Sequence, residues 1–301
     1  MLTDDIRAAA ARVTARARSV RIVDAAIEPY AATLPSAPAA PAPPATGDDD
    51  ELERRAAGSL QLNAINFGSG WFPTLRKPPG RSGFRTVEAG LRAHGPWGAE
   101  ALTRLDRDEL AAALGQDPEH ELIGRFVGHL RDLGEQARDE HGGAFLALAR
   151  CGEGSAEALA TQLGTRDSWR DVSPYGHGDR VPFFKRAQIA AADLALAGIA
   201  PARDLHRLTL FADNLVPHVL RLDGVLAFAP ELVERIEGGQ LLEHGSAEEV
   251  EIRAVALHAV ELLVAAHGRT TAAAVDGALW NRGGEPRYKA RPRHRARCEA
   301  Y

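Results

Sequence analysis

The segment SAEEVEIRAVALHAVELLVAAHG, residues 246–268, predicts the most clearly defined helix of the chain. Ser246 and Glu249 form a capping box, in which the two side chains satisfy free backbone N–H groups of the first turn. Apolar residues then recur at the i, i+3, i+4, i+7 spacing that is typical of a helix buried along one stripe: Ile252, Val255, Ala256, Ala259, Leu262, Leu263 and Ala266. Gly268 follows as a helix stop, so we expect a helix that ends there.

Other helical signals lie around this segment, and signals for strands are scarce. Asp106 and Glu109 form a second capping box before LAAAL, and Gly115 supplies a stop. Helical patterns also cover residues 120–139, 155–164, 184–198 and 230–236. Because alternating β-branched runs are rare, the sequence predicts a mainly α fold. We expect at most a few short strands, near NFGSGWFP (residues 66–73) or in the final arm.

The N-terminal region has a different composition from the rest of the chain. Residues 35–47, PSAPAAPAPPATG, are almost wholly proline and alanine, and an acidic run follows at residues 48–51. Since proline removes a backbone donor and interrupts helices and sheet ladders, we expect no regular structure in this stretch. The sequence therefore predicts an N-terminal helix with a linker over residues 1–50, and a helical domain over residues 51–301.

The composition excludes several classes of protein. With only Cys151 and Cys298 among 301 residues, neither a disulfide framework nor a zinc site made of several thiolates can form. No leader peptide and no apolar run of about 18 residues is present, so we expect a cytoplasmic protein without a membrane partner. Motifs for nucleotide, zinc-protease and serine-hydrolase sites are also absent, and we expect no metal and no cofactor. His177, His218 and His258 are separated in sequence, which is more typical of structural histidines than of metal ligands.

The end of the chain is strongly basic although the net charge is -5. In RYKARPRHRAR, basic residues occupy every second position: Arg287, Lys289, Arg291, Arg293, Arg295 and Arg297. An extended backbone would direct all of them to one side. Two interpretations stay open: a solvated basic tail, or an arm that folds back to bind a phosphate group through its forked guanidinium donors.

One candidate site is the stretch QLNAINFGSGWFP, residues 61–73. Asn66, Phe67 and Trp71 surround glycines, which permit the close backbone approach that a flat ligand needs between aromatic faces and amides. The stretch is equally compatible with an aromatic loop that packs on the core.

A second candidate site combines two helix starts. In FADNLVPHVLR, residues 211–221, Pro217 predicts a helix that begins near residue 214 or 215, so Asp213 is either a helix cap or a site residue. Lys185 and Arg186 open another apolar helix, where their charge opposes the helix dipole. This position favours a nearby anion, which could be Asp213 or a ligand phosphate.

These stretches together identify a family resemblance. In order along the chain they are LNAINFGSGWFP, SWRDVSPYGHGDRVPFFKRAQI, LTLFADNLVPHVLR, GQLLEHGSAEEVEIRA, ALWN and PRHRARC. The sequence resembles the queuosine salvage family, the queuosine 5′-phosphate N-glycosylases. The resemblance implies a single mainly helical domain similar in architecture to helix-hairpin-helix DNA glycosylases. It also implies hydrolysis of the N-glycosidic bond of queuosine 5′-monophosphate, which releases queuine for tRNA modification.

The resemblance also implies roles for individual residues. It places the catalytic groups on Asp213 and Lys185, and the substrate contacts on Asn66, Phe67, Trp71, His218, Trp280, Asn281, Arg293 and Arg295. The family often has Trp-Asp where this chain has Trp280 followed by Asn281, so a charge-dependent role at residue 281 does not carry over.

The expected partner is a small-molecule substrate, bound by a monomer. Two alternatives stay open: a non-catalytic queuine or nucleotide carrier, and a nucleic-acid base glycosylase. The net negative charge disfavours the second alternative, because nucleic-acid binders usually present a dominant basic surface.

Overall fold

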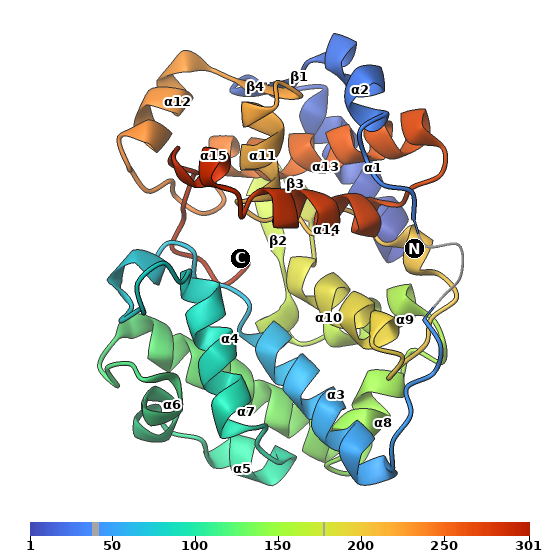
Figure 1. Ribbon diagram of the computed structural model, residues 1–301, viewed down its shortest axis with the longest axis vertical. Helices are drawn as coiled ribbons and strands as arrows, with labels where there is room; N and C mark the ends of the chain where they lie inside the picture. The colour runs from blue at the N-terminus through green and yellow to red at the C-terminus, as the bar shows by residue number, and fades with distance from the viewer. Residues whose placement is uncertain (38–41, 177) are drawn as a thin grey trace. The chain divides into compact units, whose positions relative to one another are not determined.

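The computed structural model describes residues 1–37, 42–176 and 178–301 of the chain, and these are mainly α-helical, as predicted (Figure 1). The strands among them form two antiparallel two-stranded sheets. The chain divides into two compact units. Unit 1 comprises Met1–Ala40, Asp171–Lys185 and His206–Arg297, and unit 2 comprises Pro41–Arg170, Arg186–Leu205 and Cys298–Tyr301. The predicted boundary at residue 50 stays a prediction.

Unit 1 combines helices with both small sheets. Strand β1 pairs with β4, and β2 pairs with β3 as a hairpin. The elements of unit 1 are α1 (Leu2–Thr14), β1 (Val20–Ile22), α2 (Asp24–Ala31), β2 (Val172–Tyr175), β3 (Asp179–Pro182), α11 (Val216–Leu222), β4 (Leu226–Phe228), α12 (Pro230–Glu237), α13 (Ala247–His267), α14 (Ala272–Arg282) and α15 (Pro286–Lys289).

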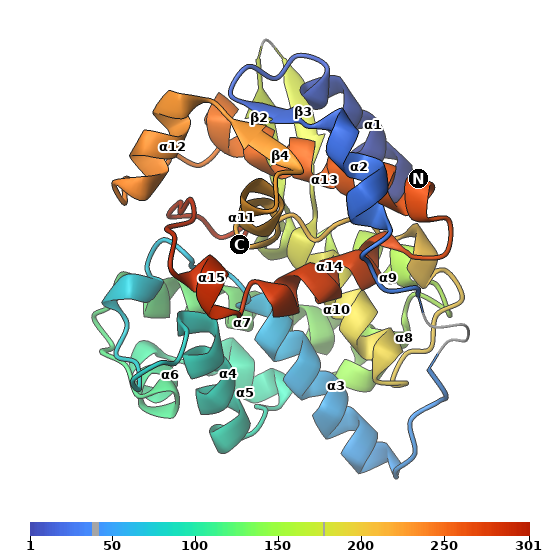
Figure 2. The same cartoon turned by 45° about the horizontal axis from the view of Figure 1, so that its top comes forward.

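Helix α13 is the centre of the unit 1 core. Its predicted N-cap and stop are confirmed, since Ser246 Oγ accepts a hydrogen bond from Glu249 N at 3.4 Å and Gly268 closes the helix with a φ of 72°. The reciprocal half of the capping box does not form, because Glu249 Oε2 accepts from Gly245 N at 3.0 Å and Ser246 N donates to Glu243 O. The prediction of a single buried stripe is wrong. Helices α1, α2 and α11 pack around α13 (Figures 1 and 2). The first half of α13 is therefore buried on nearly all sides, whereas Ala266 near its end is exposed.

Unit 2 contains most of the remaining helices, with α3, α5, α6 and α8 packed against the long helix α7. Its elements are α3 (Asp49–Ala64), η1 (Phe72–Thr74), α4 (Gly83–His94), α5 (Ala99–Arg104), α6 (Arg107–Leu114), α7 (Glu121–His141), α8 (Phe145–Arg150), α9 (Ala156–Leu163), η2 (Asp167–Trp169) and α10 (Lys185–Leu196). Lys185, the first residue of α10, belongs to unit 1. The short turn η3 (Leu205–Arg207) spans the boundary at residue 205.

Several helix boundaries follow the sequence closely. Asp106 caps α6 by accepting from Glu109 N at 2.9 Å, and Gly115 ends it in the left-handed conformation. Helices α7, α9, α10 and α12 occupy the four segments predicted from helical periodicity. These signals are local, because a cap and a stop act within one turn.

Two local predictions are wrong. The acidic run at residues 48–51 is not part of an irregular linker: Asp48 caps α3 through a 2.8 Å bond from Glu51 N, and the acids that follow occupy the first turn, where the helix dipole stabilises them. The strands lie neither near residues 66–73 nor in the final arm. The described parts of the predicted linker, residues 35–37 and 42–47, contain no helix or strand, while residues 38–41 and His177 lie outside the described residues.

Candidate active site

Asp213 lies at the start of α11 and holds the backbone there with one oxygen. Its Oδ1 accepts hydrogen bonds from Leu215 N at 2.7 Å and from Val216 N at 3.1 Å, so it binds free N–H groups at the helix start as predicted, although Leu215 is the N-cap residue. The side chain is partly exposed. Oδ2 accepts no hydrogen bond from any residue in the part of the chain that the structure describes. One carboxylate oxygen is thus structural and the other is available to a ligand.

The basic C-terminal arm, residues 290–297, folds back onto unit 1 near Asp213. Asn214 Nδ2 donates to His294 O at 2.9 Å, and Leu242 N donates to Arg295 O at 2.9 Å. Burial lowers the pKa of Arg293, and the negative charge of Asp213 opposes this effect, so these two side chains lie within electrostatic reach of each other. The backbone here is thus bonded to unit 1, and Arg293 and Arg295 are partly buried, whereas the basic side chains of Arg287, Lys289, Arg291 and Arg297 are exposed as a solvated run predicts.

Two buried histidines lie beside these groups. His218 Nε2 donates to Tyr288 O at 2.9 Å, while its Nδ1 is buried with no hydrogen-bond partner among the described residues. Burial lowers the pKa of His218 to about 4 and that of His294 to about 3. Both imidazoles are neutral at pH 7, and Nδ1 of His218 is therefore an acceptor.

A buried ion pair lies behind Asp213. The Arg253 guanidinium binds both carboxylate oxygens of Asp171, at 2.6 and 3.0 Å, and its Nε donates to Ala212 O at 2.9 Å. The Arg253 and Asp171 side chains are 0% and 1% exposed. Glu249 Oε1 lies 3.8 Å from Arg253 Nη1. Although burial raises it, the pKa of Glu249 is lowered to about 2, by the hydrogen bond from His244 and by the charge of Arg253.

Lys185 begins α10 directly after a strained residue. Phe184 has a φ of 47°, a left-handed conformation that a bulky L-residue rarely adopts. Asp171 holds this turn, because its carbonyl accepts from Phe183 N at 2.8 Å and from Phe184 N at 3.3 Å, and its Oδ2 accepts from Lys185 N at 3.2 Å. The side chain of Lys185 is buried. Asp171 thus caps this helix start through the backbone N–H of Lys185, and the expected pairing of the Lys185 charge with Asp213 or a phosphate stays a prediction.

The aromatic and amide loop belongs to unit 2. Phe67 is 1% exposed, and its ring packs edge-on against Phe126 with the Arg186 guanidinium carbon 5.1 Å from its centroid. Trp71 is also buried, and its Nε1 donates to Glu121 at 2.9 Å. Asn66 is partly exposed. Both aromatic rings are therefore enclosed by protein.

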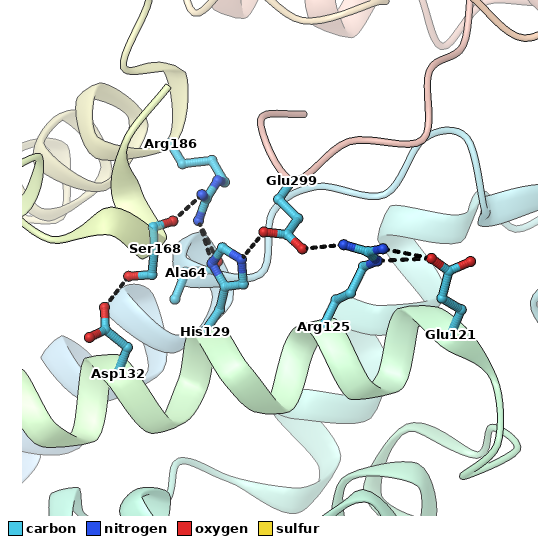
Figure 3. A network of polar contacts seen from close by, with 8 residues as sticks. All are labelled: Ala64, Glu121, Arg125, His129, Asp132, Ser168, Arg186 and Glu299. Carbon is cyan, nitrogen blue, oxygen red and sulfur yellow. Dashed lines mark hydrogen bonds and ion pairs between the residues drawn. The ribbon is translucent and has the colours of Figure 1, made fainter. Parts of the chain in front are cut away.

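A polar network supports this loop (Figure 3). Arg186 donates to Ala64 O at 2.6 Å and to Ser168 O, and its Nη1 also lies 3.3 Å from His129 Nδ1. His129 Nε2 bonds Glu299 at 3.0 Å. Because Arg186 can only donate, Nδ1 of His129 accepts and its Nε2–H donates to Glu299, which fixes the tautomer of the neutral ring.

The same network holds the last residues of the chain, 298–301. Figure 3 shows the carboxylate of Glu299 between His129 and Arg125, which project from neighbouring turns of α7. Arg125 Nη1 donates to Glu299 at 2.5 Å. Tyr301 O accepts from Gly68 N at 3.0 Å and from Ser69 N at 3.4 Å, so this segment is bonded to the loop that carries Phe67 and Trp71.

The remaining predicted residues lie at the end of α14 and in the arm. Trp280 is partly exposed, and Asn281, the family departure, is exposed in the last turn of the helix. Arg295 lies on the arm and donates to Gly239 O at 3.4 Å. Asp213, Lys185, His218, Trp280, Asn281, Arg293 and Arg295 thus belong to unit 1, whereas Asn66, Phe67 and Trp71 belong to unit 2.

No group of three or more His, Cys, Asp or Glu side chains among the described residues could hold a metal ion. Within the same residues, no helix is long and apolar enough to cross a membrane.

This helical protein is suited to bind a small anionic ligand. It presents a carboxylate with one unbonded oxygen, a buried lysine and arginines from the folded-back arm. The family model described as "Queuosine salvage protein" matches residues 86–301, and the chain belongs to that family.

Three curated relatives carry the name "Queuosine 5'-phosphate N-glycosylase/hydrolase". The protein of Sphaerobacter thermophilus is 35% identical over 67% of this chain and 65% of its own length. That of Dictyostelium discoideum is 34% identical over 65% of this chain and 63% of its own length, and that of Bos taurus is 32% identical over 57% and 56%. The matched region thus spans between about half and two thirds of these relatives.

Sequence reasoning missed the groups that hold the site. Asp171, Glu249 and Arg253 lie in the family-like stretches SWRDVSP and EVEIR, but their partners are distant in sequence. Arg253 directly precedes the apolar run AVALHAV, and a charge at such a position needs a partner when it is buried, whereas the polar surroundings of Asp171 and Glu249 in the sequence give no such signal.

Proposed function

We propose that this chain hydrolyses the N-glycosidic bond of queuosine 5′-monophosphate and releases queuine. The observation that carries the proposal is that the two carboxylate oxygens of Asp213 have different contacts. Oδ1 is bound to backbone amides, while Oδ2 stays available beside a basic arm. Membership of the family and the names of its relatives supply the substrate. We further propose that the protein acts as a cytoplasmic monomer and does not bind nucleic acid directly.

The chemistry of the base explains why a carboxylate is needed. Queuine is a 7-deazaguanine, so it lacks the ring nitrogen at which other purines are protonated when they leave. As the bond from C1′ to the base nitrogen breaks, its electron pair moves to the base and positive charge develops on the ribose. A carboxylate close to C1′ stabilises that charge. Water then adds at C1′, and the proton that it loses ends on the base nitrogen, so that neutral queuine and ribose 5-phosphate are formed.

In this proposal Asp213 Oδ2 stabilises the sugar cation, and it either orients the water or attacks C1′ itself. Lys185 either tunes Asp213 or contacts the 5′-phosphate. Arg293 and Arg295 supply further phosphate contacts from the folded arm, where guanidinium groups provide forked donors. His218, Trp280 and Asn281 complete the sugar and phosphate surroundings.

Asn66, Phe67 and Trp71 are proposed to recognise the base. Asn66 would bond its polar edge, since an amide both donates and accepts. Because the rings of Phe67 and Trp71 are enclosed, stacking on the base requires the loop at residues 66–73 to open on binding. Substituting either aromatic residue by alanine should weaken queuine binding, and unchanged affinity in both variants would count against stacking.

The proposal is tested by incubating the purified chain with queuosine 5′-monophosphate and detecting free queuine by mass spectrometry. Queuosine without the phosphate is run in parallel to measure the preference for the nucleotide. Binding of the nucleotide without release of queuine would favour the carrier alternative. If an oligonucleotide is bound with a steep salt dependence, the nucleic-acid glycosylase becomes the better reading.

A further inference from the structure

Both candidate catalytic groups are held by one buried ion pair that the proposed chemistry does not use. Arg253 is the last residue of the EVEIR stretch on α13, and Asp171 immediately precedes β2, 82 positions away in sequence. Their side chains are almost fully excluded from solvent. A buried charged pair is weak evidence for stability, because hydrophobic residues of similar volume often serve as well. Its geometry therefore calls for another explanation.

Arg253 uses its donors in two directions. The two terminal nitrogens bind the two oxygens of Asp171, and the remaining Nε–H donates to Ala212 O at 2.9 Å. The peptide group that contains this oxygen also contains the backbone nitrogen of Asp213. The guanidinium plane is fixed as well, because its central carbon lies 3.9 Å from the centroid of the Phe183 ring. A fixed guanidinium therefore fixes the backbone that carries Asp213.

Asp171 extends the same support to Lys185. Its carbonyl accepts from Phe183 N and Phe184 N, and its Oδ2, which Arg253 also binds, accepts from Lys185 N at 3.2 Å. Phe184 is held at a φ of 47° between these bonds. Strain of this kind persists only where the surroundings determine it, and it is frequent at functional sites.

We propose that Arg253 and Asp171 are positioning residues, which together set the placement of Asp213 and Lys185 for the reaction. This inference rests on the proposed function. The pair acts as a unit with Glu249, whose Oε1 faces Arg253 Nη1 at 3.8 Å and whose Oε2 faces His244 Nδ1 at 3.4 Å. None of these groups needs to touch the substrate. They fix the backbone on both sides of the reacting atoms.

The test compares Arg253→Lys with Glu251→Gln. Lysine keeps the charge but has no forked donors in a plane, so it cannot hold Ala212 O and both oxygens of Asp171 together. Glu251 is a matched control because it is buried on the same helix and accepts from Arg18 N, Ser19 N and Tyr175 Oη, away from Ala212. Assays are run well below the melting temperature of each variant.

The proposal predicts a split between kcat and KM. In Arg253→Lys, kcat for queuine release should fall about tenfold or more while KM changes by less than about threefold, because a misplaced group costs turnover more than binding. Glu251→Gln should keep kcat within about twofold even if its melting temperature falls equally. Equal loss of kcat in both variants, or an unchanged kcat in Arg253→Lys, overturns the proposal.

Hydrogen exchange tests the positioning role independently of whether the protein hydrolyses queuosine 5′-monophosphate. Arg253→Lys should deprotect the amides of residues 183–185 and 215–216, whereas Glu251→Gln should deprotect those of residues 18 and 19 instead. If the parent releases no queuine, the reaction is wrong and the exchange pattern still tests the positioning role. Unchanged exchange at residues 183–185 and 215–216 in Arg253→Lys overturns that role.

If Arg253→Lys does not fold, the double variant Asp171→Asn with Arg253→Gln removes both charges of the pair, and the buried Glu249 carboxylate then keeps His244 as its partner. It should fold, and its kcat should fall about tenfold or more, as expected for Arg253→Lys. A folded double variant with the kcat of the parent overturns the proposal.

Discussion

At the scale of single residues, Asp213 explains why sequence reasoning found two roles for one side chain. Its Oδ1 binds Leu215 N and Val216 N at the start of α11. The side chain is partly exposed, and its Oδ2 is available to a ligand. The structural role and the proposed chemical role therefore do not compete. They use different oxygens of the same group, and substitutions can separate them.

Asp213→Asn should abolish most activity without loss of stability. The amide oxygen of asparagine can still accept from the two backbone N–H groups, but the negative charge is gone, so kcat should fall by about 10²-fold or more. Asp213→Ala removes the cap as well and should cost about 1 kcal/mol of stability in addition. Melting curves together with queuine release measure both effects, and near-parent release by the folded asparagine variant would refute the assignment.

Lys185→Met distinguishes the two roles proposed for the lysine. Methionine preserves the length and the apolar contacts of this buried side chain but removes its charge. A contact to the 5′-phosphate predicts a higher KM for the nucleotide alone, whereas tuning of Asp213 predicts a lower kcat for both nucleoside and nucleotide. Steady-state kinetics on the two substrates provide the measurement. A variant with parental constants on both would remove Lys185 from the site.

At the scale of elements, the final segment is part of the fold although its sequence is typical of a tail. His294, Ala296, Cys298 and Ala300 are buried and alternate with more exposed residues as an extended chain requires, and Tyr301 is buried as well. The alternation of basic residues therefore predicts the extended backbone of the last part of the chain, but not the conformation of residues 286–289. Residues 286–289 form the short helix α15, so the six basic side chains do not share one face.

Deleting residues 298–301 should destabilise the protein measurably. The buried Tyr301 side chain alone contributes about 2 kcal/mol, which corresponds to a melting temperature lower by roughly 3 °C in a chain of 301 residues. The deletion also removes the acceptor for Gly68 N and the carboxylate that binds His129 and Arg125. Calorimetry measures the shift.

The control for this deletion is Arg291→Ala, which removes an exposed ion pair with Glu237. Such a pair contributes little, so the melting temperature should stay within about 2 °C of the parent. A truncated protein as stable as this control would show that the segment is dispensable.

The elements also show which parts of the fold the sequence can specify. The caps at Asp106 and Ser246 and the stops at Gly115 and Gly268 act within one turn, and the sequence predicts them correctly. The burial of α13 on nearly all sides could not be predicted, because it depends on which helices pack around it. The contacts of Arg253 with Asp171 and of His129 with Glu299 join residues 82 and 170 positions apart, and no local pattern encodes them.

At the scale of the whole molecule, buried neutral histidines make stability depend on pH. In an unfolded chain an imidazole binds a proton near pH 6.5, but His218 does so only near pH 4 and His294 near pH 3 in the folded protein. Burial also lowers the pKa of His129. Below about pH 6.5 the unfolded state binds more protons than the folded state, so the free energy of unfolding falls as the pH is lowered.

The melting temperature should therefore drop between pH 7.5 and pH 5.0. Each imidazole of this kind contributes a loss of about 1.5 kcal/mol between pH 6.5 and pH 5. Calorimetry at several pH values measures the slope, and His218→Gln should reduce it, whereas His206→Gln, at an exposed position, should leave it unchanged. If the two variants show the same pH dependence as the parent, burial of His218 does not control acid sensitivity.

Each of the two units is built from three segments that are separated in the sequence, which affects how the protein folds during synthesis. The chain passes from one unit to the other after residues 40, 170, 185, 205 and 297, so each unit is assembled from separated segments. While the polypeptide emerges from a ribosome, unit 1 lacks α13 and unit 2 lacks α10 until most of the chain has been translated. Nascent chains arrested before residue 170 should therefore rely on chaperones, and neither unit can be inherited, exchanged or expressed as one contiguous gene fragment.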